Sequence, residues 1–257
     1  MRDRFAVRPR CQGQEGVAET MSEKVLAGHT AFITGGARNI GKATALALAD
    51  AGANVVVNTL QDEAAASAVA EEIRSRGGQA MVAVGDVVSA EKVAEMVEAG
   101  RQAFGDIDIL VANASARGQI DFLEMDHATF RRVVDISIDG TFHLAQAMLP
   151  MMIAKNWGRI VTLGGISWHI GINRRAHNLT AKSGLTGLTR ALAVEFADRG
   201  ITANMVSPGA IETARPQSAG QMPQRATTSP VPRPGHVDEV ASAVRFLCDP
   251  QQAYMTG

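Results

Sequence analysis

The chain has 257 residues, 46% of them apolar, and a formal net charge of −1. This charge argues against nucleic acid or an anionic membrane as the main partner, since either normally requires a basic excess, so a small-molecule substrate is expected. No apolar run approaches the roughly 20 residues of a membrane span, and Cys11 and Cys248 match no metal or redox spacing. We therefore expect a soluble, cytoplasmic protein with free thiols and no metal site.

The first twenty residues are polar, include four arginines and lack the apolar centre of a secretory signal. Asp3, Glu15 and Glu19 argue against a transit peptide, because such peptides contain few acids. We expect residues 1–24 to be a disordered extension, or the result of a start codon placed too early, with Met21 as the true beginning.

From residue 29 onward, short apolar or β-branched runs alternate with longer amphipathic segments. This alternation is typical of repeated βαβ units, so it predicts an α/β fold: a single Rossmann-type domain over 25–257 with a doubly wound parallel sheet. Strands are predicted at 30–34, 54–58, 80–85, 107–112, 159–164 and 202–207. Helices are predicted at about 39–51, 62–76, 89–104, 126–155, 177–199 and 237–248.

The segment 210–236 is rich in Pro, Ser, Thr and Gln, and it is too long for an ordinary connection in a compact domain. It follows the carboxyl end of a predicted strand, where open α/β sheets bind ligands. We therefore expect a substrate lid, with a disordered loop as the alternative.

The stretch TAFITGGARNIGKATALALADAG joins the first predicted strand to the first helix through a glycine turn. Gly35 permits the tight turn, backbone N–H groups can approach a pyrophosphate, and the helix N-terminus favours negative charge. A tight turn without a ligand is the alternative. The strand–turn–helix context, with further βα units behind it, favours a dinucleotide phosphate site.

Several ordered motifs make residues 28–257 resemble the short-chain dehydrogenase/reductase family. The family's Thr-Gly-x-x-x-Gly-x-Gly appears as TGGARNIG, with the middle glycine replaced by Asn39, which tolerates a left-handed backbone. Other family motifs are resembled by GDV (85–87), LVANAS (110–115) and SPGAIET (207–213). The resemblance implies a nicotinamide cofactor held by Gly35, Arg38, Asn39, Ile40, Gly41, Asn58, Asp86, Val87, Asn113, Ala114, Lys182, Pro208, Gly209, Ile211 and Thr213.

The choice of cofactor depends on charge near the adenosine ribose. An acid at the end of the second strand would bind a 2′-hydroxyl and repel a 2′-phosphate, but VVVNTLQ contains no acid before Asp62. Arg38 could pair with that phosphate through its guanidinium, although a solvated arginine at a helix start is the alternative. NADP(H) is therefore favoured, and NAD(H) is possible.

The catalytic positions implied by the resemblance are altered. A tyrosine should exchange a proton four residues before Lys182, but that position holds Asn178, and the only tyrosine is Tyr254. The family's serine falls at Gly165, and its helical asparagine falls at Ser137. Lys182 is retained, and the resemblance gives it a contact with the cofactor ribose.

Other side chains are candidate proton donors. Ser167 and His169 follow the strand predicted to end at the site, and either could enter from the loop. His177 points about 100° away from Asn178 on a helix, unless the helix begins one residue later. Lys182 could itself act as an acid if it is desolvated, although its ribose contact competes with that role. Ordinary loop or cap roles are the alternative for the serine and the histidines.

Three functions are compatible with these residues. The first is an NAD(P)(H)-dependent oxidoreductase that acts on a small carbonyl or alcohol with a non-standard proton donor. The second is a cofactor-binding pseudoenzyme that serves as a sensor or as an oligomer partner. The third is a lyase, isomerase or decarboxylase without net redox change.

The resemblance also implies a homodimer or homotetramer formed through the helices at 126–155 and 177–199. Family members continue past the position of Gly257 into a final strand, which is either absent from this protein or follows the given sequence.

Overall fold

A six-stranded parallel sheet forms the centre of the structure, a computed structural model that describes residues 24–214 and 230–257. The strands lie in the order β3-β2-β1-β4-β5-β6, and each hydrogen-bonded pair is parallel. Strand order reverses between β1 and β4, and open α/β sheets bind ligands at such a switch point. The strands are β1 (Thr30–Ile33), β2 (Asn54–Thr59), β3 (Ala80–Val84), β4 (Ile109–Ala112), β5 (Gly158–Leu163) and β6 (Ile201–Val206).

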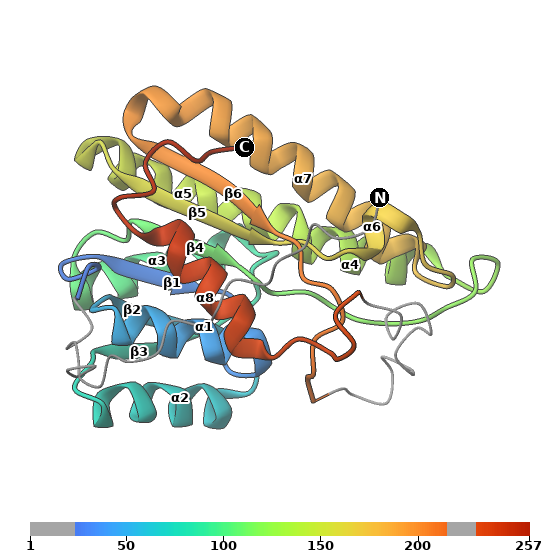
Figure 1. Cartoon of the computed structure of the whole chain (residues 1–257), viewed down its shortest axis with the longest axis horizontal. Coiled ribbons are helices and arrows are strands. Elements are labelled where there is room, and N and C mark those ends of the chain that lie inside the picture. The colour runs from blue at the N-terminus through green and yellow to red at the C-terminus, as the bar shows by residue number, and fades with distance from the viewer. Residues whose placement is uncertain (1–23, 215–229) are drawn as a thin grey trace, which may run out of the picture.

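Helices cover both faces of this sheet (Figure 1). One buried cluster joins α1, α2 and α8 to one face, and a second joins α3, α5 and α7 to the other. The predicted α/β class with a doubly wound, Rossmann-type sheet is therefore confirmed. The helices are α1 (Asn39–Asp50), α2 (Glu63–Ser75), α3 (Ala90–Phe104), α4 (His127–Ser137), α5 (Asp139–Lys155), α6 (Ser167–Ile170), α7 (Ala176–Phe196), the 3₁₀ turn η1 (Ala197–Arg199) and α8 (Val237–Cys248).

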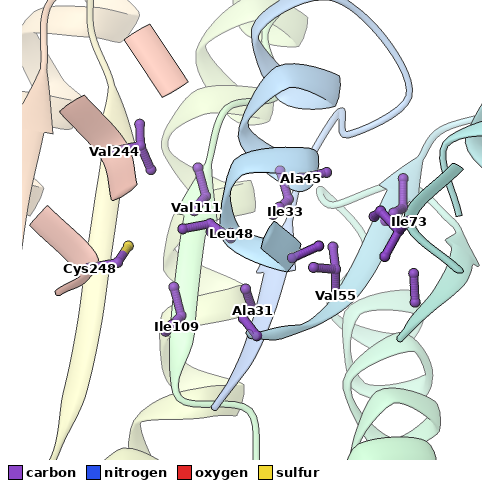
Figure 2. Packing of buried hydrophobic residues seen from close by; sticks show 14 of the residues in the cluster. Ala31, Ile33, Ala45, Leu48, Val55, Ile73, Ile109, Val111, Val244 and Cys248 are labelled. Atoms are coloured by element: carbon purple, nitrogen blue, oxygen red, sulfur yellow. The ribbon is translucent and has the colours of Figure 1, made fainter. Parts of the chain in front are cut away.

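The core follows from the period of two along the strands. In β1, Ala31 and Ile33 point to the α1 side, whereas Phe32 points to the α3 and α5 side. Figure 2 shows the first cluster, in which Leu48 of α1 and Cys248 of α8 lie over the strands. Burial raises the pKa of the Cys248 thiol to about 12, so this cysteine behaves as a core residue. Every predicted strand is present, with ends displaced by at most two residues.

The single helix predicted over 126–155 is wrong, because the chain breaks at Ile138 into α4 and α5. The Thr141 hydroxyl donates to the Ser137 carbonyl (2.7 Å), and such back-bonding bends helices. The turn also brings Gly140 against Val87, where an added Cβ would lie 2.6 Å from a Val87 methyl carbon. The break therefore allows the helix pair to pack closely against the residues after β3.

The amino edge of the sheet contains a buried carboxylate that is hydrogen-bonded to a histidine and a lysine. Asp108, just before β4, is fully buried and accepts hydrogen bonds from His29 Nδ1 (2.9 Å) and Lys155 Nζ (2.9 Å). The Thr30 N–H donates to its other oxygen (3.0 Å). Burial alone would raise the pKa of Asp108, but these hydrogen bonds outweigh it and the pKa is lowered. The His29 ring also stacks on Trp157, with ring centroids 3.8 Å apart.

The predicted lid lies partly outside the described residues, because positions 215–229 are not among them. Its two flanks lie side by side: the Glu212 N–H donates to the Gly235 carbonyl (2.9 Å) and the Gly235 N–H donates to the Ala210 carbonyl (2.8 Å). The predicted extension, residues 1–24, lies outside the described residues except for Lys24.

Within residues 24–214 and 230–257, no helix has the length and apolar character needed to cross a membrane.

Candidate active site

The glycine loop between β1 and α1 has the geometry of a phosphate-binding turn. Gly35 (φ 59°) and Asn39 (φ 48°) both adopt the left-handed backbone, so asparagine takes up the conformation for which the family uses glycine. A Cβ on Gly41 would lie 2.1 Å from the Gly35 carbonyl oxygen, so only glycine fits there. The loop therefore folds so tightly that the backbone at Gly41 packs directly against the Gly35 carbonyl.

The N-terminus of α1 lacks a protein anion. Its N-cap residue, Arg38, makes no capping hydrogen bond through its side chain, and the first turn contains no acid. By contrast, Asp62 caps α2 and Asp126 caps α4. The first backbone N–H groups of a helix, together with its dipole, favour an anion, so this end fits the pyrophosphate of a dinucleotide.

Two asparagines support the loop from below. The buried Asn58 side chain accepts from the Gly35 N–H (3.4 Å) and donates to the carbonyls of Ala83 (3.1 Å) and Gly85 (3.2 Å). Asn113 donates through its amide to the Thr34 (2.8 Å) and Gly35 (3.1 Å) carbonyls. The structure thus places Asn58, a predicted cofactor residue, in a buried position beneath the loop.

Charged residues flank the loop on the side of α2 and β3. Arg38 is exposed and forms an ion pair with Asp62, the N-cap of α2. Asp86, after β3, pairs with Arg132 of α4 at 2.8 Å, and the following Val87 is buried. Ala114 donates its N–H to the Thr34 hydroxyl (2.8 Å), which fixes the chain after β4.

A cleft opens at the carboxyl ends of β4, β5 and β6. It brings together six of the predicted cofactor residues beyond the glycine loop, one residue of α1 and four of the predicted catalytic positions, with Lys182 counted in both groups. Its described lining comprises Ile40, Asn113, Ser115, Arg117, Gly118, Leu163, Gly164, Gly165, Ile166, Ser167, Ile172, Arg175, Asn178, Lys182, Pro208, Gly209, Ala210, Ile211 and Thr213.

Lys182 lies at the base of this cleft. Its side chain is 5% exposed, and its Nζ donates to the Leu163 carbonyl at the end of β5 (2.6 Å). Burial, aided by the nearby charge of Arg117, lowers its pKa to about 8. Among the described residues that line the cleft, the ionisable groups are Lys182 and two arginines, so Lys182 is the one that titrates near neutral pH.

The altered positions leave polar groups beside Lys182. Asn178 stands one helical turn before it on α7, and both line the cleft. A Cβ built on Gly165 would lie 3.8 Å from the Ser167 hydroxyl oxygen. A hydroxyl group therefore lies near the position that a serine at 165 would have occupied.

The other candidate donors are placed elsewhere. Because α7 begins at Ala176, His177 is helical; it is 1% exposed and lines a second pocket beside α4. Burial, with Arg175 adding a smaller effect, lowers its pKa. His169 is exposed, and its ring lies tilted against that of Trp168 (3.6 Å between centroids), outside the described cleft lining. Ser137 is buried at the end of α4, and its hydroxyl has no partner among the described residues.

Two arginines of the cleft were missed by the sequence analysis. Arg117 follows the LVANAS motif and donates to the Thr213 hydroxyl (3.3 Å). Arg175 is the N-cap residue of α7 and is half-buried. Its spacing of three from Asn178 and seven from Lys182 predicts a shared helix face, a signal that could have identified it.

Comparisons with known proteins identify related reductases and dehydrogenases. The family model described as enoyl-(acyl carrier protein) reductase matches residues 35–257. A 3-oxoacyl-[acyl-carrier-protein] reductase of Synechocystis sp. is 37% identical over 233 residues, which cover 90% of this chain and 94% of that protein. A putative gluconate dehydrogenase structure from Agrobacterium tumefaciens has a TM-score of 0.84 at 29% identity, covering 92% of this chain and 94% of that one. Acetoin dehydrogenase YohF from Salmonella typhimurium has a TM-score of 0.80 at 31% identity, covering 89% and 91%.

The sheet order and the match to solved structures confirm the fold that the resemblance implied. Together with the family match and the identity to these relatives, it shows that the chain belongs to the short-chain dehydrogenase/reductase family of NAD(P)-dependent oxidoreductases.

Proposed function

We propose that the protein interconverts a small carbonyl compound and its alcohol with NADP(H), using Lys182 in place of the family's tyrosine as the source of the proton. The relatives' names, which include reductases and dehydrogenases, support this reaction class. When bound, the reduced cofactor supplies hydride to a carbonyl carbon, and the carbonyl oxygen then requires one proton from the protein.

The observation that carries this proposal is the identity of the ionisable groups in the cleft. Arginine does not lose its proton in proteins, whereas Lys182 has a pKa of about 8. General acids work best when their pKa lies near the operating pH. Lys182 therefore has the acid strength that reduction requires, and Asn178 does not titrate.

Ser167 and Asn178 supply hydrogen-bond donors beside this acid. Both line the cleft, and the Ser167 hydroxyl lies near the position of the family's serine. Preorganised donors stabilise the negative charge that develops on a carbonyl oxygen during hydride transfer. We propose that these two groups bind the oxygen while Lys182 delivers the proton through the Ser167 hydroxyl or a water molecule.

Arg38 supports NADP(H) over NAD(H). Its side chain is exposed beside the glycine loop, and β2 ends at Thr59 without an acid. A guanidinium binds a phosphate through charge-assisted hydrogen bonds. Asp62 competes for the same guanidinium, so the preference depends on that ion pair being exchanged for the 2′-phosphate.

The loss of the tyrosine favours a second candidate, a cofactor-binding protein without redox turnover. Asn178 cannot exchange a proton, and Gly165 has no hydroxyl. In this case the site serves as a sensor, or it carries out a lyase or isomerase reaction.

A matched pair of variants tests these candidates. NADPH oxidation is measured with a panel of small ketones for the native protein, for Asn178→Tyr and for Asn178→Phe, which has the same ring without the hydroxyl. We expect slow native turnover, a rise of about 10²-fold or more in Asn178→Tyr, and none in Asn178→Phe. No native turnover with any ketone, but turnover in Asn178→Tyr, would support the second candidate. A native rate equal to that of Asn178→Tyr would show that no tyrosine is needed.

We also propose a homodimer or homotetramer. Exposed apolar side chains on two helices of one face, Phe142 of α5 (43% exposed) and Val194 of α7 (84% exposed), support a protein interface there. Light scattering of the native protein and of Val194→Glu tests this, with a monomeric native protein as the contrary result. The cytoplasmic location stays a prediction.

A further inference from the structure

The described part of the active-site cleft is cationic. Arg117, Arg175 and Lys182 line it, and no aspartate or glutamate is found among its described lining residues. Cations that face a common cleft without an opposing acid raise its potential and attract anions. The cleft therefore favours a ligand with a negative charge at this end.

The two walls of the cleft present these cations to the same space. Arg175, Asn178 and Lys182 follow one face of α7, so Arg175 lies on the opposite side of Asn178 from Lys182. Arg117 comes from the segment after β4, and its hydrogen bond to Thr213 (3.3 Å) carries its guanidinium to the chain after β6. Arg117 and Lys182 both line the cleft, and the charge of Arg117 helps to lower the pKa of Lys182.

Helix geometry sets a distance along this face. Three residues of rise separate Arg175 from Asn178, which is about 4.5 Å along the axis. A group bound by Arg175 would therefore lie a few bonds from a carbonyl placed at Asn178. The apolar Ile166 and Ile172 line the cleft as well, which leaves room for a short carbon skeleton between the two ends.

The cofactor's own phosphates have a separate place. The glycine loop and the uncapped N-terminus of α1 fit the pyrophosphate, and Arg38 is beside the expected 2′-phosphate. Arg175 belongs to none of these elements, because it precedes α7. Arg175 instead lines the cleft beside Asn178 and Lys182.

We propose that the substrate is itself an anion, a short oxo or hydroxy compound whose carboxylate or phosphate group is bound by Arg175, assisted by Arg117, a few bonds from the reacting carbon. This proposal rests on the proposed function, since it names the substrate class of that reaction. Arginine suits the role because its planar fork pairs with both oxygens of a carboxylate or phosphate.

The test compares matched anionic and neutral probes on the full chain saturated with NADP⁺. Calorimetry measures the affinities of acetoacetate against acetoacetamide, and of dihydroxyacetone phosphate against dihydroxyacetone. We expect at least one anion to bind about tenfold or more tightly than its neutral partner. Arg175→Gln should remove this preference, and Arg175→Lys should retain part of it. Arg190→Gln, an exposed position on the same helix, is the control and should change nothing.

The two anions distinguish the ligand chemistries, because a preference for only one of them identifies a carboxylate or a phosphate. Equal affinities within both pairs, or a preference that survives Arg175→Gln, would overturn the proposal. Separate titration of NADPH checks that Arg175→Gln still folds and binds cofactor. Anion binding without any NADPH oxidation would support the charged ligand and reject the redox reaction. Turnover of neutral ketones alone would support the redox reaction and reject the charged substrate.

Discussion

Buried charged groups at the two edges of the sheet, where the strands begin and where they end, have opposite surroundings. At the amino edge, the buried Asp108 is matched by His29 and Lys155. At the carboxyl edge, the buried Lys182 has a backbone carbonyl as its hydrogen-bond partner and Arg117 as a neighbouring like charge. A buried carboxylate with hydrogen-bonding partners stabilises the fold. A buried lysine beside a like charge destabilises the fold, and its pKa is lowered. We therefore expect the charge of Asp108 to serve stability and the charge of Lys182 to serve the reaction.

The largest expected effect comes from removing the charge at the carboxyl edge. Lys182→Met should lower ketone reduction by about 10²–10⁴-fold, because the proton source is lost. It should also raise the free energy of unfolding at pH 7, by up to about 3 kcal/mol, since the depressed lysine pKa is a cost of folding. Denaturant unfolding and steady-state kinetics measure the two effects. A variant that is less active and less stable would contradict the contrast between the edges.

The same lysine predicts a pH dependence. Lys182 must be protonated to donate, so reduction should be constant below pH 8 and fall about tenfold per pH unit above it. The sign for stability is the opposite: the folded pKa lies below the unfolded value, so the cost of the buried charge decreases as pH rises from about 8 to about 10.5. Single-turnover rates at saturating NADPH provide the test. A profile without a break between pH 7 and pH 9 would exclude Lys182 as the acid.

A change at the amino edge should alter the stability of the fold and leave cofactor binding unchanged. Asp108→Asn should lower the free energy of unfolding by about 1–3 kcal/mol, because the buried oxygen loses its charge-assisted bonds to His29 and Lys155. The pKa of Asp108 is lowered in the fold, so the loss is complete at pH 7 and shrinks as pH falls below about 4. Asp106→Asn is the control. Reduced cofactor affinity with unchanged stability would show that this cluster is not structural.

The smallest expected effect concerns the exposed ion pair. Asp62→Asn should free Arg38 and raise NADPH affinity about two- to fivefold with little change for NADH, since exposed pairs contribute at most about 1 kcal/mol. Arg38→Ala should abolish the preference. Fluorescence titration of both cofactors measures it, and equal gains for NADH and NADPH would mean that Asp62 acts on something other than the 2′-phosphate.

The sequence was sufficient for those features that depend on local pattern. Apolar periodicity and glycine placement predicted the strands, the doubly wound sheet and the turn at Gly35. Patterns do not report which groups meet across the fold, however. The ion pair of Arg38 with Asp62 and the approach of Arg117 to Thr213 join residues far apart in the chain.

The direction of individual side chains was the other feature that the sequence did not predict. Asn58 was expected to end a strand at the ribose, but β2 continues to Thr59 and the Asn58 amide turns under the loop to satisfy backbone groups. The start of α7 decided the orientation of His177, and helix boundaries are among the least certain features of a sequence. The break at Ile138 was not predicted either, because the helical pattern over 126–155 does not reveal the close approach of Gly140 to Val87 that accompanies it.

Asn39 has a further consequence for the timing of the reaction. Its amide both donates to the Ala214 carbonyl (3.2 Å) and accepts from the Ala214 N–H (3.0 Å), which a glycine at this position could not do. The glycine turn and the chain after β6 are thereby joined. For a dinucleotide bound between them, as proposed above, release would require both bonds to open. We expect a long residence time for the oxidised cofactor, and Asn39→Gly should shorten it in stopped-flow displacement. Release of the oxidised cofactor would then be the rate-limiting step of each turnover.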